Sequence, residues 1–249
     1  MFLHGSYGND TNIFAESDVD VVIRLDDIYF FDLENLPADE RASFEQALTP
    51  FTYAYKDFRR DVLATLTKEY GNAATDGTKA IAIAAAGSRR KADVIVAAQH
   101  RRYHRYKGPS DARYDQGIGF IDKAGQRITN YPRQHAENLT AKHQCSSRRL
   151  KPMIRGFKNL RSRLVDGQLI APGTAPSYYL EGLLYNVPDP LFTSSFQTSV
   201  ANGLNWILKA DRTKFVCANK QYYLFHESSP VTWRARQCEQ FLAAAVKLW

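Results

Sequence analysis

The sequence is poor in cysteine and has no long apolar run, no internal repeat and no low-complexity tract. Its three cysteines, Cys145, Cys217 and Cys238, are an odd number and stand far apart, which argues against a disulfide framework and a CxxC metal site. No apolar stretch approaches the roughly 20 residues of a membrane-spanning helix, and residues 1–4 carry no signal-peptide pattern. We therefore expect a cytoplasmic protein with reduced thiols and no membrane partner.

Acidic residues are scarce in one part of the chain. Residues 88–163 hold 19 Lys or Arg against five Asp or Glu, within a chain of formal net charge +7. This excess of positive charge indicates binding of a polyanion, either a nucleoside triphosphate or a nucleic acid. A basic surface that serves only solubility would explain the charge nearly as well. Charge alone does not choose between these partners.

The chain of 249 residues, with 44% hydrophobic content, is long enough to bury a core. A strand-rich first part gives way near Pro132 to helical patterns, so we predict domains at 1–140 and 141–249. Apolar periodicity predicts individual elements: helices within 36–50 and over 58–70, 150–164 and 234–249, a hairpin of strands 80–86 and 92–98 with a basic tip, a second hairpin over 117–125, and a loop at 72–78.

Two carboxylates mark the start of an apolar strand. Asp18 and Asp20 stand two apart beside Val19, Val21 and Val22, and alternate residues of a strand share a face. The like charges repel unless a cation bridges them, and hard oxygen ligands favour Mg²⁺ or Mn²⁺. A solvated strand edge is the alternative interpretation of this pair alone.

Asp93 is the third candidate carboxylate, because it interrupts an otherwise apolar strand. An ionised side chain there is costly unless it is paired, exposed or bound to a cation. An exposed edge or a salt bridge to Arg90 or Arg102 would explain it, but a two-metal site needs further oxygen ligands from another strand. Asp26 is the competitor, and it lies about 20 Å along the strand from Asp20, too far to share the ions.

Upstream of the carboxylates, Gly5 lets the backbone approach a ligand closely, and Ser6 adds a hydroxyl and an N–H of the kind that cradles phosphate. A Walker loop is excluded, since no Gly-Lys-Ser/Thr follows.

A Gly-Ser turn, a short spacer and Asp-x-Asp entering an apolar strand resemble the DNA polymerase β-type nucleotidyltransferase superfamily. Three further runs resemble its bacterial CD-NTase and cyclic GMP-AMP synthase branch: NDTNI at 9–13, KPMIRGFKNLRSRL at 151–164 and PSYYLEGLLYNVP at 176–188. Many members carry glycine where this chain has Asp10. The resemblance implies an α+β fold, with a mixed β-sheet core, flanking helices and a C-terminal helical lobe.

The resemblance also implies site residues and an activity. Asp18, Asp20 and Asp93 would hold two Mg²⁺ ions, for which Mn²⁺ can substitute. Gly5, Ser6, Lys158 and Ser177 would bind the triphosphate of ATP, GTP or a pyrimidine nucleotide, and Tyr178 would stack on its base. The product would be a cyclic di- or trinucleotide that activates a separate effector in antiphage (CBASS) defence.

Several alternatives stay open at this point. The basic and aromatic residues at 99–107 suit either phosphate and base contacts or a wet strand end, and Lys151, Arg155 and Lys158 suit either a triphosphate or a solvated helix face. A related enzyme could instead modify an antibiotic, protein or RNA, and a non-catalytic basic module could bind nucleic acid. No counterpart of the zinc-bearing, DNA-gripping insertion of animal cyclic GMP-AMP synthase is found, so we expect no nucleic-acid activator. Family members normally have a long helix before the Gly-Ser turn, where this sequence has four residues, so a minimal member and a missing upstream segment both remain open.

Overall fold

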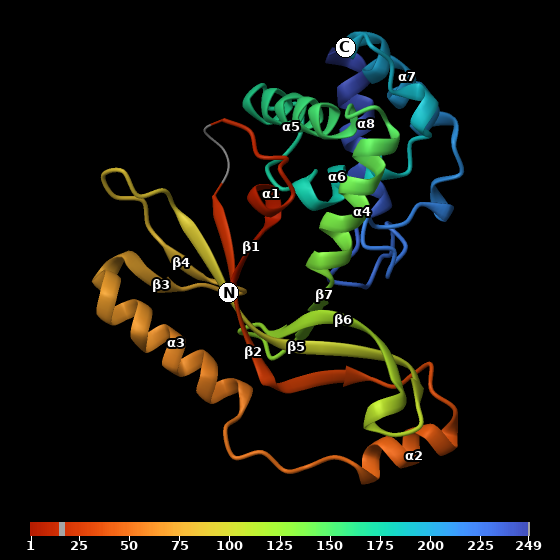
Figure 1. Ribbon diagram of the computed structural model, residues 1–249. Helices are drawn as coiled ribbons and strands as arrows, with labels where there is room; N and C mark the ends of the chain where they lie inside the picture. Colours follow the sequence, from red (N-terminus) through yellow and green to blue (C-terminus); the bar gives the residue numbers. More distant parts are fainter. Residues whose placement is uncertain (15–17, 249) are drawn as a thin grey trace. The chain divides into compact units, whose positions relative to one another are not determined.

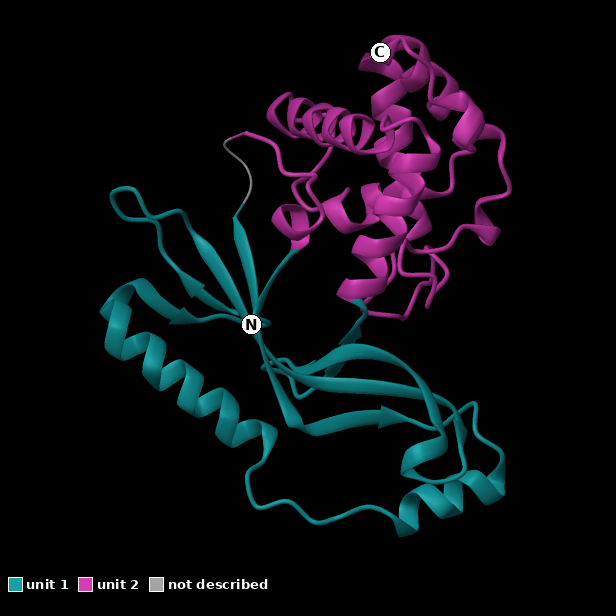
Figure 2. Cartoon of the chain, viewed as in Figure 1, with its two compact units in different colours: residues 1–4, 18–131 teal, residues 5–17, 132–249 magenta. Residues whose placement is uncertain are grey.

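In the computed structural model, which describes residues 1–14 and 18–248, the chain forms two compact units (Figure 2). Of the described residues, unit 1 contains 1–4 and 18–131, and unit 2 contains 5–14 and 132–248. Residues 15–17, in the spacer between the Gly-Ser turn and Asp18, and Trp249 of the predicted last helix lie outside the described residues. This division differs from the predicted one in two ways: the chain passes between units at Tyr131, and the segment that follows His4 groups with the helical unit.

Among the described residues, unit 1 is built on a seven-stranded mixed sheet (Figure 1). The central strand β5 pairs in parallel with β2 and in antiparallel with β4 and β6, while β1 borders β2, β3 borders β4 and β7 borders β6. The strands are β1 (Phe2–His4), β2 (Val19–Asp32), β3 (Ala74–Asp76), β4 (Ile81–Ile83), β5 (Ala92–Tyr106), β6 (Ala112–Ile121) and β7 (Arg127–Asn130).

Helix α3 (Tyr55–Tyr70) covers one face of this sheet. Its stripe of Phe58, Val62, Leu66 and Tyr70 packs against Ile81 and Ile83 of β4, Val94 and Val96 of β5 and Ile23 of β2. The helix ends at Gly71, whose φ of +56° is a left-handed conformation that glycine adopts without strain. The predicted stripe and its stop are both confirmed.

A second small core lies farther along β2 and β5. Phe44 of α2 (Ala38–Gln46) is buried, and its ring lies 4.9 Å from that of Tyr103 and 5.1 Å from that of Tyr106. The aromatic residues after Ala98 are therefore packing residues of a long strand.

Unit 2 is helical, as predicted. The helices are α1 (Gly5–Gly8), α4 (Pro132–Cys145), α5 (Leu150–Asp166), α6 (Ser177–Tyr185), α7 (Phe196–Lys209) and α8 (Ala235–Leu248), with 3-10 turns at Asp189–Leu191 and Arg212–Lys214. In the apolar stripe of α5, Ile154, Phe157 and Leu164 are completely buried in the core of this unit, and Leu160 packs against it partly buried. Within residues 1–14 and 18–248, no helix is both long and apolar enough to cross a membrane.

Two predictions about unit 1 were wrong. The predicted loop at 72–78 contains β3, a three-residue strand that exists because it pairs with β4, and its short polar sequence carries no periodic signal. The predicted strand at 92–98 continues to Tyr106, because pairing with both β2 and β6 extends it through the basic and aromatic run.

Candidate active site

The predicted carboxylates lie on neighbouring parallel strands of unit 1. Asp20 of β2 pairs in register with Asp93 of β5, and Val19 pairs with Ala92. Directly paired residues point to the same side of a sheet, so the side chains of Asp20 and Asp93 stand next to each other. Asp18 lies two residues before Asp20, immediately before β2 begins.

These carboxylates lie on the sheet face opposite α3. Val21 and Ile23 of β2 pair with Val94 and Val96 of β5, and these β5 side chains pack under α3. Because side chains alternate along a strand, Asp20 and Asp93 project from the other face. His4 of β1 pairs with Asp20, so its side chain continues the same row.

A lysine engages the first carboxylate. Lys91 Nζ donates a hydrogen bond to Asp18, and the half-exposed side chains form an ion pair. The hydrogen bond to Asp18 raises the pKa of Lys91, against the opposing effect of burial, and the charges of Asp93, Asp18 and Asp20 raise it further. All three carboxylates therefore act on the same ammonium group.

Among the described residues, no group of three or more His, Cys, Asp or Glu side chains is placed so that it could hold a metal ion. The three aspartates nevertheless have the right chemistry, because they offer hard carboxylate oxygens from one sheet face, and a cationic group is already drawn to them. The competitor Asp26 is instead paired with Arg24.

The predicted phosphate-binding turn belongs to unit 2. Gly5 has a φ of +60° and begins the single-turn helix α1, which also contains Ser6. Backbone N–H groups of Asn9 and Thr11 donate to the carbonyls of Gly5 (3.0 Å) and Ser6 (2.9 Å), so the loop after α1 folds back on the turn. Asp10 in that loop has a φ of +53°, a conformation in which glycine is unstrained, which accounts for the glycine of many relatives.

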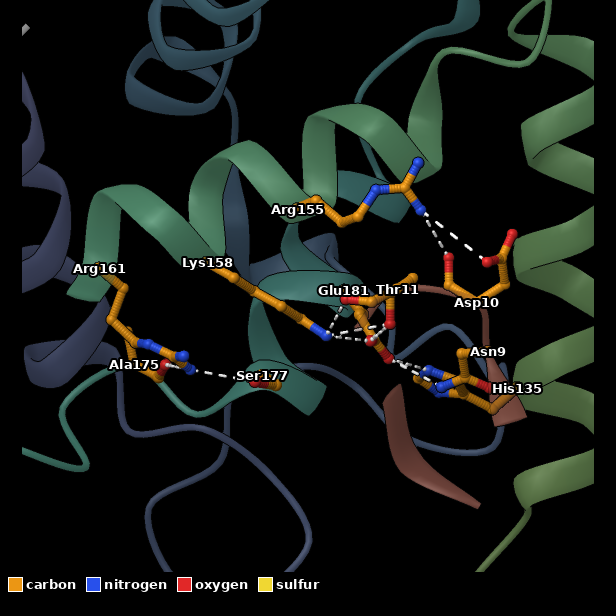
Figure 3. Close-up of polar contacts among 10 residues, drawn as sticks. All are labelled: Asn9, Asp10, Thr11, His135, Arg155, Lys158, Arg161, Ala175, Ser177 and Glu181. Atoms are coloured by element: carbon orange, nitrogen blue, oxygen red, sulfur yellow. Dashed lines mark hydrogen bonds and ion pairs between the residues drawn. The ribbon is translucent and has the colours of Figure 1, made fainter. Parts of the chain in front are cut away.

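A buried carboxylate holds this loop to three helices (Figure 3). Glu181 of α6 accepts hydrogen bonds from Asn9 Nδ2 (3.0 Å), Thr11 Oγ1 (2.5 Å), His135 Nε2 of α4 (2.7 Å) and Lys158 Nζ of α5 (2.8 Å). Burial alone would raise the pKa of Glu181, but the hydrogen bond from His135 and the charge of Lys158 hold it well below its usual range. The carboxylate is therefore ionised and joins the loop to α4, α5 and α6.

Lys158 is buried, with 1% of its surface exposed, and it faces the interior of unit 2. Its ammonium donates to Glu181 Oε1, to the carbonyl of Thr11 (3.1 Å) and to the hydroxyl of Thr11 (3.0 Å). These three bonds use all the N–H groups of the side chain. A phosphate could contact Lys158 only by replacing one of these partners, so its role in the structure as it stands is to anchor the loop.

Two other cations of α5 are better placed to meet an anion. Arg155 donates to the carbonyl of Asp10 (2.9 Å), and its guanidinium lies 4.0 Å from the carboxylate of Asp10. Lys151, whose side chain is only 11% exposed, lies 3.9 Å from the same carboxylate. Both cations therefore approach the carboxylate of Asp10 in the loop, as Figure 3 shows for Arg155.

Ser177 and Tyr178 begin α6, four residues before Glu181. Arg161 Nη1 donates to Ser177 Oγ (3.0 Å), which brings a further cation to this serine. The ring of Tyr178 stacks on His135 at 4.9 Å, and its hydroxyl accepts a hydrogen bond from Asn219 Nδ2 (2.9 Å). One face of this ring is already covered, so a nucleotide base would have to stack on the other.

The basic run of β5 is satisfied within unit 1. Arg102 bonds to Asp32 (2.9 Å), Arg105 bonds to Asp111 (2.6 Å), and Arg101 lies over the ring of Tyr29 at 3.9 Å. These contacts favour the structural interpretation of residues 99–107 over a phosphate clamp.

Sequence reasoning missed Glu181, His135, Asn9 and Thr11. A lone glutamate in the apolar run Leu180–Leu184 was the available signal, because a charge at a buried helix position requires a partner.

Comparisons with known proteins agree with this architecture. A profile of the C-terminal helical domain of cGAS/DncV-like nucleotidyltransferases matches residues 137–249. The chain is 38% identical to a cyclic UMP-AMP synthase of Rhodothermus marinus over 100% of its own length and 84% of that protein. The chain belongs to the cGAS/DncV-like nucleotidyltransferase (CD-NTase) family.

Within this CD-NTase family the chain is of the CdnE type. It is 36% identical to the cyclic nucleotide synthase CdnE01 of Staphylococcus haemolyticus, again over 100% of the chain and 84% of the relative. The solved structure of Rhodothermus marinus CdnE, a c-UMP-AMP synthase with bound Apcpp and Upnpp, superposes with a TM-score of 0.87 at 37% identity, covering 100% of this chain and 82% of that one. The chain is a nucleotidyltransferase of the cyclic nucleotide synthase class, a class of enzymes that typically depends on metal ions.

Proposed function

We propose that the CD-NTase described here joins two nucleoside triphosphates into a cyclic dinucleotide and releases pyrophosphate, with Asp18, Asp20 and Asp93 as its catalytic carboxylates. The observation that carries this assignment is the register of the sheet, which sets Asp20 beside Asp93 on adjacent strands. A strand pair that exposes two carboxylates side by side, with a third two residues upstream, is costly without a cation and suits a cation well.

We assign Mg²⁺, or Mn²⁺ in its place, to these three carboxylates as a pair of ions. Such ions activate a ribose hydroxyl as a nucleophile and neutralise charge on the α-phosphate and the departing pyrophosphate. We also assign Asp93 as the group that accepts the proton of the ribose hydroxyl. Its carboxylate interrupts the apolar pattern of β5, so packing does not explain its presence.

The donor nucleotide is assigned to residues of unit 2. Gly5 and Ser6 supply the turn at α1, Ser177 supplies a hydroxyl beside Arg161, and Tyr178 supplies a ring face for the base. We assign Lys158 to the nucleotide-binding lobe as the residue that anchors the loop after Ser6. Arg155 and Lys151, which lie beside Asp10, supply the positive charge for the triphosphate. The family resemblance supports these assignments, and the contacts cited for them all lie within this one unit.

ATP and UTP are the substrates to test first, since the relative from Rhodothermus marinus is a cyclic UMP-AMP synthase. We assign the reaction to the cytoplasm, where nucleoside triphosphates are made and used. The product would act as a second messenger for a separate effector, in keeping with a role in antiphage defence.

The test is incubation of the protein with each α-³²P-labelled nucleoside triphosphate, singly and in pairs, with Mg²⁺ or Mn²⁺. We expect a product that resists phosphatase, has the mass of a cyclic dinucleotide, and forms best when ATP and UTP are both present. A labelled antibiotic, protein or RNA acceptor in place of that product would show an acceptor-modifying enzyme. Label that stays entirely sensitive to phosphatase, with no pyrophosphate released, would overturn the proposal.

A further inference from the structure

Lys91 occupies a position at the carboxylates that the proposed reaction does not explain. It is the last residue of the β4–β5 connection, and its carbonyl accepts a hydrogen bond from the backbone N–H of Val19 (3.0 Å). This bond extends the parallel pairing of β2 and β5 by one step and sets Lys91 alongside the Asp18–Val19 peptide. The backbone position of Lys91 is therefore fixed by the sheet.

The side chain of Lys91 turns back to the carboxylates even though about half of it is exposed to solvent. A lysine side chain with access to water has many alternative conformations, and holding it in one place costs rotamer entropy. The ion pair with Asp18 is the contact that offsets this cost. Asp20 and Asp93 add to the attraction, because their charges also act on the Lys91 ammonium.

We propose that Lys91 is a built-in counter-ion of the metal site: its ammonium group pairs with Asp18 when no divalent ion is bound, and it competes with the ion for this carboxylate. The inference rests on the proposed metal-binding role of these aspartates. It makes Lys91 a residue that sets the affinity of the site for metal without being a ligand.

This competition has two linked consequences. Removing the ammonium takes away the counter-ion of Asp18 and destabilises the metal-free protein, since adjacent like charges repel. The metal-bound protein loses much less, because the ion supplies the neutralising charge. Loss of the lysine therefore tightens metal binding while it weakens the metal-free fold.

The experiment uses the full chain without nucleotide and measures Mn²⁺ binding from the electron paramagnetic resonance signal of the free ion. Lys91→Met is compared with Arg90→Met, which removes the same charge from the neighbouring exposed position, and Arg90 makes no hydrogen bond or ion pair with the residues that the structure describes. Lys91→Arg retains the charge. We expect Lys91→Met to bind Mn²⁺ about fivefold more tightly than the wild type, with both other variants within about twofold of it.

Thermal unfolding gives a second readout that does not depend on activity. Lys91→Met should melt below the wild type without metal and gain more from added Mn²⁺, whereas Arg90→Met should follow the wild type in both conditions. Substitution at a half-exposed position before a strand leaves the core intact, so folding is not at risk.

Asp20→Asn separates failure of this inference from failure of the proposed function. If Asp20→Asn abolishes Mn²⁺ binding but Lys91→Met and Arg90→Met bind the ion equally, the role of Lys91 is overturned and the metal site stands. If the wild type shows no Mn²⁺ binding that depends on Asp20, the metal assignment falls, and the role of Lys91 falls with it.

Discussion

Asp20 and Asp93 lie opposite each other on the parallel strands β2 and β5, although 73 positions separate them in the sequence. Their neighbours pair in the same register, Val19 with Ala92 on one side and Val21 with Val94 on the other. The two carboxylates project from the sheet face that α3 leaves uncovered. The proposed chemistry depends on this pair, and each of the following predictions tests one part of the structure around it.

The first prediction concerns the charge of Asp20. Asp20→Asn should lower the rate of pyrophosphate release by at least about 100-fold, because loss of an oriented charge at a reacting centre has costs of that order. The matched control is Asp26→Asn, which removes the same charge from the same strand but from a side chain that is 59% exposed and paired with Arg24. Equal rates in the two variants would remove Asp20 from the site.

The second prediction concerns the buried ion pair of Lys158 and Glu181, whose side chains are 2% and 3% exposed. Glu181→Gln leaves the Lys158 charge without its anion in the interior and should lower the free energy of unfolding by about 3–5 kcal/mol. Chemical denaturation measures the change. The control is Glu137→Gln, which breaks the exposed pair with Arg133 and should cost less than about 1 kcal/mol. A loss below about 1 kcal/mol for Glu181→Gln would contradict the account of this network.

The third prediction concerns the loop that follows the Gly5-Ser6 turn. Thr11→Val keeps the shape of the side chain but removes the hydroxyl that bonds to Glu181 and Lys158, so the loop loses part of its anchor. We expect the KM for nucleoside triphosphate to rise about tenfold with a smaller change in kcat, since the loop would position ground state and transition state alike. Thr11→Ser retains the hydroxyl and should stay close to the wild type. Steady-state kinetics of both variants decide the point, and an unchanged KM in Thr11→Val would show that the loop does not set nucleotide affinity.

The fourth prediction concerns pH. His100 is 2% exposed, and burial, followed by the nearby charge of Arg127, lowers its pKa from 6.5 to about 4. Between about pH 6.5 and about pH 4, His100 is therefore protonated in the unfolded chain but not in the folded chain. The free energy of unfolding consequently falls as the pH falls through this range. At pH 5 the loss from this group is about 2 kcal/mol relative to neutral pH.

His100→Leu provides the comparison for this pH effect. The difference in unfolding free energy between pH 7 and pH 5 should shrink by about 2 kcal/mol in the variant, because the titrating group is gone. The comparison uses the pH dependence of each protein separately, so a constant change in stability caused by the substitution does not affect it. An unchanged pH dependence would show that His100 does not titrate as the structure indicates.

The carboxylates could be predicted from the sequence because their signal is local. Asp18 and Asp20 alternate at the entrance to an apolar strand, and Asp93 breaks an apolar run, so period and composition were enough to place Asp20 and Asp93 on strands and Asp18 at the start of one. That a later strand brings Asp93 to the other two was expected only from the resemblance to a known family, since strand periodicity does not specify which strand lies beside which.

The environment of Lys158 could not be predicted in the same way. Helical spacing placed it beside Lys151 and Arg155, but a helix pattern does not show what faces each position. Its partners Thr11 and Glu181 lie 147 and 23 residues away in the sequence. Contacts of this kind depend on how helices and loops pack, and so a lysine that resembled an exposed phosphate ligand proved to be a buried anchor.

The central claim is that Asp18, Asp20 and Asp93 hold the divalent ions of the transfer reaction, and anomalous diffraction from crystals grown with Mn²⁺ and a non-hydrolysable ATP analogue tests it most directly. We predict anomalous peaks bound by carboxylate oxygens of all three aspartates, with Lys91 turned away from Asp18. Manganese found elsewhere in the protein, or a site at Asp18 and Asp20 that Asp93 does not reach, would contradict the account.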